Sequence, residues 1–175
     1  MSDAEFFAGL TGSPNDLRLA VEALRSCGHP FCVIGGLAVN HYAEPMVTLD
    51  ADFAMTAATG AGEALQLAGF RVEEFPHSLN AMLPGSCLRI QITINSRYGS
   101  FPSRAITGTL FGVELPIACL ADVVQGKLWA ATDAKRRPTK RQKDAVDLAR
   151  LAEINPEVFD LVPVNTIPGL DEIRP

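Results

Sequence analysis

The sequence predicts an α/β (α+β) protein, with a mixed sheet flanked by helices and a small helical part at the C-terminus. Three observations lead to this prediction. A short apolar run, Phe31 to Ile34, lies between Pro30 and a glycine pair, as in a buried strand that turns into a helix. Residues 88–94 alternate between apolar and polar side chains, as in a strand with one buried face. After Cys119 the apolar residues recur at helical spacing.

Composition and charge limit the classes of protein to consider. The chain has 175 residues, of which 47% are hydrophobic and 20% charged, as in ordinary globular proteins. Its net charge of -5 gives no support to general nucleic-acid binding, which usually needs a basic surplus. No secretory leader and no apolar run long enough to cross a membrane is visible, so we expect a cytoplasmic protein. The cysteines match no zinc spacing, and we expect small, reduced side chains, mostly in apolar stretches, at Cys27, Cys32, Cys87 and Cys119.

The first helix is predicted from its end signals. Ser13 is suited to cap it, Pro14 to occupy its first position, and Asp16 adds an acid to its first turn. Gly28 closes it. After the strand at 31–34, the expected elements are a helix over 37–43, a strand over 48–55, a helix over 59–67, strands over 70–75, 81–83 and 88–94, a polar loop over 96–104, and a hairpin over 106–117.

The C-terminal third is predicted to be helical. One helix covers residues 120–132, and Pro138 is expected to prevent helix formation around it, so the second helix should run from Gln142 to about Glu153. Several prolines follow in an irregular tail. We therefore divide the chain into a core over 1–118, a helical part packed on it over 119–155, and a tail over 156–175.

Gly35 and Gly36 lie between the first strand and the next helix. Two glycines let the backbone turn sharply and approach a ligand, and the free N–H groups of the helix can then face a phosphate. An ordinary strand-to-helix turn would show the same pattern, and for the glycine pair taken alone this second explanation is the better one.

Asp50 and Asp52 are the strongest candidates for chemistry. Residues two apart on a strand point to the same side, and paired carboxylates are natural ligands of Mg²⁺. The alternative is an exposed strand end with two solvated acids. The other side of this strand argues against that alternative, because its residues are apolar and are expected to be buried: Leu49, Ala51, Phe53 and Met55.

Cations and histidines give weaker signals. Lys127 lies in an otherwise apolar helix, where its ammonium could reach a phosphate. The basic run from Lys135 to Lys143 usually indicates a solvated loop. Asp144 and Asp147 share a helix face and would ordinarily pair with neighbouring cations, namely Lys140, Lys143 or Arg150. No histidine has a second metal ligand at suitable spacing, so none is assigned a catalytic role.

Taken in order, these motifs resemble the polymerase-beta-like nucleotidyltransferase superfamily. Residues 33–42, which include the glycine pair, and residues 48–53, which include Asp50-Ala51-Asp52, resemble its signature of a glycine-opened helix followed by a DxD strand. The GGxA form resembles the AbiEii-like branch, which includes toxins of type IV toxin–antitoxin systems. Residues 120–130 resemble the "LxDLxxxKLxA" helix of that branch, and residues 141–148 resemble its "R-x-KDxxDL" helix.

The resemblance implies a minimal nucleotidyltransferase fold and a reaction. Gly35 and Gly36 would line a triphosphate, Asp50 and Asp52 would hold Mg²⁺, and Lys127 would contact phosphate. Asp144 or Asp147 would complete the wall of the site. Members of the family transfer a nucleotide from an NTP to an acceptor such as RNA, a protein hydroxyl or a small molecule, and an antitoxin partner is expected for the toxin branch.

Two departures from the family pattern leave the function open. Met46 occupies a place where the family often has arginine, and Gln91 occupies the place expected for a third carboxylate, which acts as general base and metal ligand. A neutral amide cannot accept the proton. Either another acid substitutes, such as Glu73, Glu74 or Glu114, or activity is reduced, or the domain binds nucleotide or a protein partner without catalysis.

Overall fold

The structure is a computed structural model that describes residues 15–175. Its strands form one mixed sheet of seven. The strand order is β3-β4-β5-β2-β1-β7-β6. The strands are β1 Phe31–Ile34, β2 Asp50–Met55, β3 Arg71–Phe75, β4 Ser78–Met82, β5 Arg89–Thr93, β6 Ile106–Leu110 and β7 Val113–Ile117. β1 pairs parallel with β7 and β2 parallel with β5, and the other neighbours are antiparallel. The predicted α/β class with a mixed sheet is therefore confirmed.

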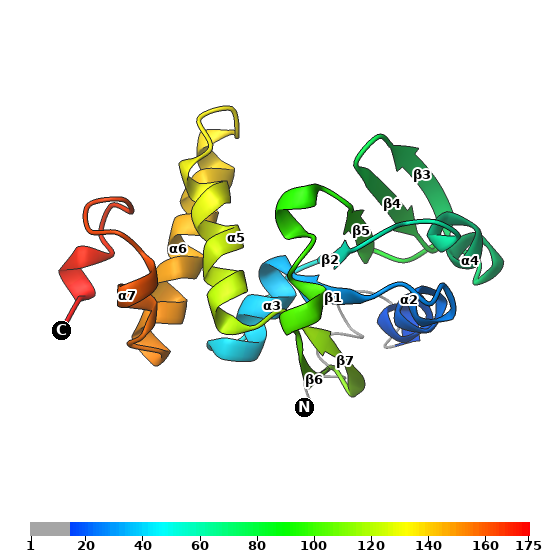
Figure 1. Cartoon of the computed structure of the whole chain (residues 1–175), viewed down its shortest axis with the longest axis horizontal. Coiled ribbons are helices and arrows are strands. Elements are labelled where there is room, and N and C mark those ends of the chain that lie inside the picture. Colours follow the sequence, from blue (N-terminus) through cyan, green and yellow to red (C-terminus); the bar gives the residue numbers. More distant parts are fainter. Residues whose placement is uncertain (1–14) are drawn as a thin grey trace.

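The helices cover the sheet and extend beyond it. They are α2 Asn15–Ser26, α3 Gly35–Tyr42, α4 Ala61–Leu67, α5 Leu120–Thr132, α6 Pro138–Ile154 and α7 Val158–Leu161. α2 packs on α4, whereas α3 packs on β1 and β2 and also contacts α5 and α6. Figure 1 shows α5 and α6 side by side at one end of the molecule, with the β3–β4 hairpin at the other end. The predicted helix cap Ser13 and the predicted first helical residue Pro14 lie outside the described residues.

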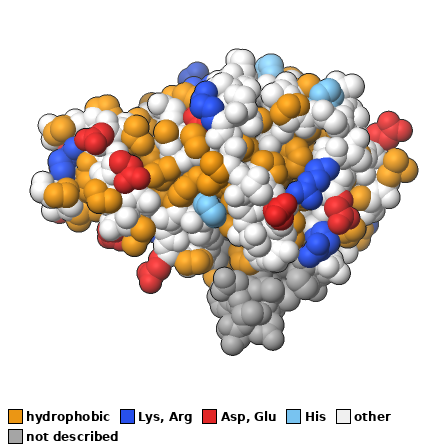
Figure 2. Space-filling model, turned by 60° about the horizontal axis from the view of Figure 1, so that its bottom comes forward, with side chains coloured by type: hydrophobic (Ala, Val, Ile, Leu, Met, Phe, Trp, Pro, Cys, Tyr) orange, Lys and Arg blue, Asp and Glu red, His pale blue; other side chains and the backbone are white. Residues whose placement is uncertain are grey.

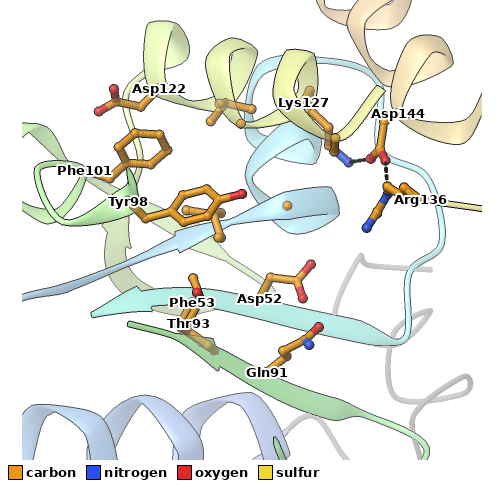
Figure 3. Close-up of a pocket in the computed structure, with 15 residues that line it drawn as sticks. Asp52, Phe53, Gln91, Thr93, Tyr98, Phe101, Asp122, Lys127, Arg136 and Asp144 are labelled. Carbon is orange, nitrogen blue, oxygen red and sulfur yellow. Dashed lines mark hydrogen bonds and ion pairs between the residues drawn. The ribbon is translucent and has the colours of Figure 1, made fainter. Parts of the chain in front are cut away.

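The core follows the apolar patterns of the sequence. The apolar face of β5 and of the residue before it is buried, with Leu88, Ile90 and Ile92 at most 1% exposed, as the alternation predicts. α2 contributes Leu17, Val21 and Leu24, which recur at helical spacing and are fully buried. Burial of these faces leaves the opposite, polar face of β5 turned toward α5, where Gln91 lies (Figure 3).

Two helix boundaries differ from the sequence-based predictions. Pro138 does not break the last long helix but begins it, because proline lacks only an N–H group that the first turn of a helix leaves unpaired in any case. α6 therefore starts four residues before Gln142. α3 begins at Gly35 and not at Leu37, because the chain turns out of β1 at Gly35 itself, whose φ is 66°.

Three further expectations are corrected. Leu49 is 38% exposed, since β2 begins at Asp50 and Leu49 precedes the alternating strand. The strand expected at 81–83 starts earlier, at Ser78, in the hairpin with β3. Cys87 is exposed, whereas Cys32 is buried, and all four cysteines are free.

The C-terminal segment packs on α5 and α6. α7 contacts both helices, and the buried side chains after residue 155 include Val158, Phe159 and Leu170. Large hydrophobic side chains also remain exposed here, at Ile154, Leu161, Val164 and Ile173. Figure 2 shows hydrophobic side chains spread over this end of the molecule. Between residues 15 and 175, none of the helices combines the length and the apolar character that a membrane crossing requires.

Candidate active site

The glycine pair brings the start of α3 against the acids of β2. Gly35 has a φ of 66°, a left-handed conformation that residues with a Cβ rarely adopt. A Cβ at Gly35 would also collide with the carboxylate of Asp52. At Gly36 an added Cβ would come within 3.4 Å of the Thr48 hydroxyl. The sequence therefore has glycine where the start of a helix must lie directly against a carboxylate.

Three side chains form the floor of the site. Asp50 and Asp52 lie two apart on β2 and line the same cleft. β2 pairs in parallel register with β5, which sets Gln91 beside Asp52 (Figure 3). Arg89, two residues before Gln91, holds one oxygen of Asp50 at 2.7 Å from its guanidinium. The floor thus has the carboxylates of Asp50 and Asp52 and the amide of Gln91 where a third carboxylate was expected. The guanidinium of Arg89 is paired with Asp50.

Burial and charge make Asp52 unusual among these groups. Burial of the carboxylate and the neighbouring charge of Asp50 raise the pKa of Asp52 to about 6, although Lys127, Lys143 and Arg136 lower it in part. Two like charges on one face repel, and a cation between them would relieve that repulsion. The pair therefore has the donor chemistry and the electrostatic strain of a divalent-cation site.

Replacing Asp52 with asparagine is expected to stabilise the folded protein at neutral pH. The folded state binds the Asp52 proton more tightly than the unfolded chain, whose carboxyl has the usual pKa of 3.8. Stability is therefore gained as the pH falls through about 6, and the full gain is reached below about 4. At pH 7.5 in EDTA, Asp52→Asn should raise the free energy of unfolding by about 1–3 kcal/mol, measured by urea denaturation.

The same measurement at lower pH provides the control. The advantage of Asp52→Asn should shrink as the pH falls from 6 toward 4, because the wild-type carboxyl then becomes protonated. Asp50→Asn, which removes a partly exposed ion pair with Arg89, should change stability by no more than about 1 kcal/mol and should not stabilise. If Asp52→Asn were less stable than the wild type at pH 7.5, the negative charge of Asp52 would not destabilise the folded protein, contrary to this prediction.

A buried ion cluster on α5 and α6 closes the site from the opposite side. The ammonium of Lys127 lies 2.9 Å from Asp144 and 2.6 Å from Asp147. Burial lowers the pKa of Lys127, but the two carboxylates outweigh this effect and raise it above its usual value. Arg136 also binds Asp144, at 3.0 Å, and Arg150 binds Asp147, at 2.7 Å. Of the partners predicted for the two acids, Arg150 is the one observed in these pairs.

A cleft separates the floor from this cluster and has two lobes. The first, here called the polar lobe, has a volume of about 350 Å³. Its acidic floor, Asp50 and Asp52, faces a wall of cations from the start of α6 and the segment before it. Gly36 and Thr48 also line the polar lobe, and the cations are Lys127, Arg136, Arg137, Lys140 and Lys143. The basic run, expected from the sequence to be a solvated loop, thus contributes side chains to the site.

The second lobe, here called the aromatic lobe, has a volume of about 230 Å³. Tyr98 and Phe101 line it from the segment 96–104, and Val123, Gly126 and Ala130 line it from α5. These residues are not predicted from the sequence, because 96–104 has the composition of a polar loop, yet Phe101 is only 2% exposed. Two aromatic side chains in so short a loop were the signal that could have indicated their burial. The two lobes share Asp52, Gln91, Lys127, Arg136 and Asp144.

Other predicted candidates lie elsewhere. Glu73, Glu74 and Glu114, which were considered as substitutes for the third carboxylate, line neither lobe. Within residues 15–175 no three acidic, histidine or cysteine side chains are close enough to share a metal. His41 lies against Gly108 of β6 and stacks edge-on with Tyr42. A metal at this floor would therefore have two carboxylates, the Gln91 amide and non-protein oxygens as ligands.

Comparison with solved structures identifies the architecture as a nucleotidyltransferase fold, as predicted. The crystal structure of ANT(2'')-Ia in complex with adenylyl-2''-tobramycin is similar with a TM-score of 0.61 and 16% identity, over 85% of this chain and 93% of that one. The solution structure of the same antibiotic-resistance factor is similar with a TM-score of 0.59 and 17% identity, over 83% of this chain and 86% of that one. A putative nucleotidyltransferase from H. pylori is similar with a TM-score of 0.59 and 19% identity, over 92% of this chain and 74% of that one. No protein-family model and no curated protein sequence matches the chain.

Proposed function

We propose that the protein binds an NTP with Mg²⁺ in the polar lobe and transfers its nucleotide to an acceptor hydroxyl. The observation that carries this proposal is the arrangement of opposite charges in one cleft. Two carboxylates on β2 face a row of cations from the start of α6, as a metal-bound polyphosphate requires. The nucleotidyltransferase fold, shared with the solved structures, supports the same assignment.

The residues present fit Mg²⁺ with few protein ligands. Asp50 and Asp52 would hold the ion, and Mg²⁺ in proteins commonly has one or two carboxylates and completes its octahedron with water and substrate phosphates. Arg89 occupies one oxygen of Asp50 and leaves the other for the cation. When bound, Mg²⁺ would supply charge neutralisation at the phosphates undergoing transfer.

The reaction breaks one bond and forms one. The acceptor oxygen attacks the α-phosphorus, the bond from that phosphorus to the bridging oxygen breaks, and pyrophosphate leaves. Arg137, Lys140 and Lys143 would hold the leaving pyrophosphate, beside the N–H of Gly36 at the start of α3. Gln91 cannot accept the proton of the acceptor, so the proton would pass to solvent water.

A second candidate function follows from Gln91 and Arg89. A site that lacks the third carboxylate and pairs Asp50 with a guanidinium is suited to bind a nucleotide without turnover. In that case the protein would be a nucleotide sensor or would act through contacts with a protein partner. The AbiEii-like branch, a toxin role, an antitoxin partner and an RNA or protein acceptor remain predictions from the sequence.

Calorimetry and label transfer distinguish these functions. We expect ATP or another NTP to bind in Mg²⁺, and label from the α-phosphate to appear in cell extract or added RNA. Asp50→Ala should reduce transfer by at least ~10²-fold, whereas Glu153→Gln, an exposed acid on α6 outside the cleft, should not. Binding without transfer would favour the nucleotide sensor. Absence of binding for all four NTPs would overturn both the transferase and the sensor and would point to a role in contacts with a protein partner.

A further inference from the structure

We infer that the aromatic lobe is the acceptor site, and that it takes a neutral molecule carrying a hydroxyl group on or beside a flat ring. This inference rests on the proposed function, because it assigns the second substrate of the same reaction. It starts from the relation between the two lobes, which share Asp52 and Gln91.

The geometry of phosphoryl transfer assigns a role to each lobe. The attacking oxygen and the leaving oxygen lie roughly in line on opposite sides of the phosphorus. The cations that suit pyrophosphate, Arg137, Lys140 and Lys143, line the polar lobe alone. With pyrophosphate in the polar lobe and the α-phosphorus over Asp52, the aromatic lobe is the other part of this cleft that reaches Asp52, and we assign the attacking hydroxyl to it.

The lining of the aromatic lobe indicates a flat ring. Tyr98 and Phe101 meet edge to face, with ring centroids 5.2 Å apart. Gly126 of α5 packs directly against both rings, because an added Cβ there would be in ordinary van der Waals contact, 3.7 Å from Tyr98 and 3.8 Å from Phe101. The lobe itself is lined by Tyr98 together with Phe53, Val123 and Ala130, and this aromatic and apolar lining suits a flat ring.

The charges around the aromatic lobe indicate a neutral ligand. Asp122 lies in the lobe, but the guanidinium of Arg104 holds both of its oxygens, at 3.1 and 2.6 Å. Asp144 is likewise bound by Lys127 and Arg136. Each of these two carboxylates thus has its own cation. Asp52, the third carboxylate of the lobe, would be neutralised by the bound Mg²⁺, so the lobe has no surplus of negative charge with which to attract a polycationic amino sugar.

Tyr98 supplies a polar group at the junction of the two lobes. Figure 3 shows its hydroxyl pointing into the space between Lys127 and Asp52. Burial raises the pKa of Tyr98 above its usual value, which keeps the phenol neutral and able to donate a hydrogen bond. The hydroxyl is therefore placed to orient an acceptor oxygen beside the floor.

Filling the aromatic lobe tests this inference. Gly126→Leu and Ala130→Leu place bulk in the aromatic lobe and leave the residues of the polar lobe unchanged. Ala121→Leu is the matched control, because Ala121 is exposed near the start of α5 and lines neither lobe. Trp129 is the single tryptophan, and its ring stacks on Phe101 at 6.0 Å, so its fluorescence reports on the lobe.

The probes are phenyl β-D-glucopyranoside as a neutral ring and tobramycin as a cationic amino sugar. The glucoside should change Trp129 fluorescence in the wild type and in Ala121→Leu, with at least a tenfold weaker response in Gly126→Leu or Ala130→Leu. Mg²⁺–ATP binding should stay within about twofold in every folded variant. Melting curves identify a variant that does not fold, and the other of these two variants then provides the test.

Three results would overturn the inference while leaving nucleotide binding intact. They are an unchanged glucoside response in folded Gly126→Leu or Ala130→Leu, a stronger response to tobramycin than to the glucoside, and a loss of more than tenfold in ATP affinity on filling the lobe. The last result would mean that the lobe holds the nucleotide. Failure of the proposed function looks different, because the wild type would then bind no NTP.

Discussion

Replacing Gln91 with aspartate is expected to raise the rate of nucleotidyl transfer by about 10²-fold. Gln91 is the register neighbour of Asp52 on the parallel strand β5 and lines both lobes of the cleft. An aspartate there would add the carboxylate that can accept the acceptor proton, a role that contributes about 10²–10⁴-fold in enzymes. The measurement is the initial rate of label transfer from an α-labelled NTP in Mg²⁺.

Gln91→Asn is the matched control for this prediction. It shortens the side chain as aspartate does but adds no charge, so its transfer rate should not exceed that of the wild type. A third carboxylate beside Asp50 and Asp52 also adds like-charge repulsion, so Gln91→Asp should be less stable than Gln91→Asn when no divalent cation is present. Equal transfer rates for the two variants would show that proton removal does not limit the reaction.

Replacing Lys127 with methionine is expected to destabilise the protein by about 3 kcal/mol. Lys127 lies between Asp144 and Asp147, and all three side chains are at most 9% exposed. Removal of the ammonium leaves two buried carboxylates that retain only Arg136 and Arg150 as partners. Removing one member of a buried ion cluster lowers the free energy of unfolding, because the remaining charges are neither hydrated nor fully paired.

Thermal and urea unfolding at pH 7.5 measure this effect. The melting temperature should fall by roughly 6–12 °C for a chain of this size. Lys135→Met makes the same substitution at an exposed turn position before α6 and should change stability by less than about 0.5 kcal/mol. Equal stability of the two variants would mean that the cluster contributes to ligand binding and not to folding.

The fold and the floor of the site follow largely from local patterns. The alternation in 88–94 places Gln91 on the polar face of its strand, and the spacing of Asp50 and Asp52 places both on one face of theirs. The structure agrees on each point. The sequence also indicates the glycine pair, although only the structure explains it, since Gly35 must leave room for the Asp52 carboxylate.

Long-range contacts escaped the sequence analysis. Lys127 and Asp144 are 17 residues apart, and no spacing rule relates a lysine on one helix to an acid on the next. Their contact depends on how α5 and α6 rotate as they pack. The aromatic lobe was missed for a similar reason, because the burial of Phe101 results from its packing against the ring of Trp129 on α5.

The sequence by itself determined which side chains share a face. Backbone geometry repeats every two residues in a strand and every 3.6 in a helix, and this periodicity needs no partner. It indicated the paired acids and placed Gln91 on the polar face of its strand, whereas the resemblance to the nucleotidyltransferase superfamily marked Gln91 as the third position. Only the tertiary structure decided which faces meet: β2 with β5, α5 with α6, and the segment 96–104 with α5. Those contacts join residues distant in the chain, and their choice depends on the packing of the whole core.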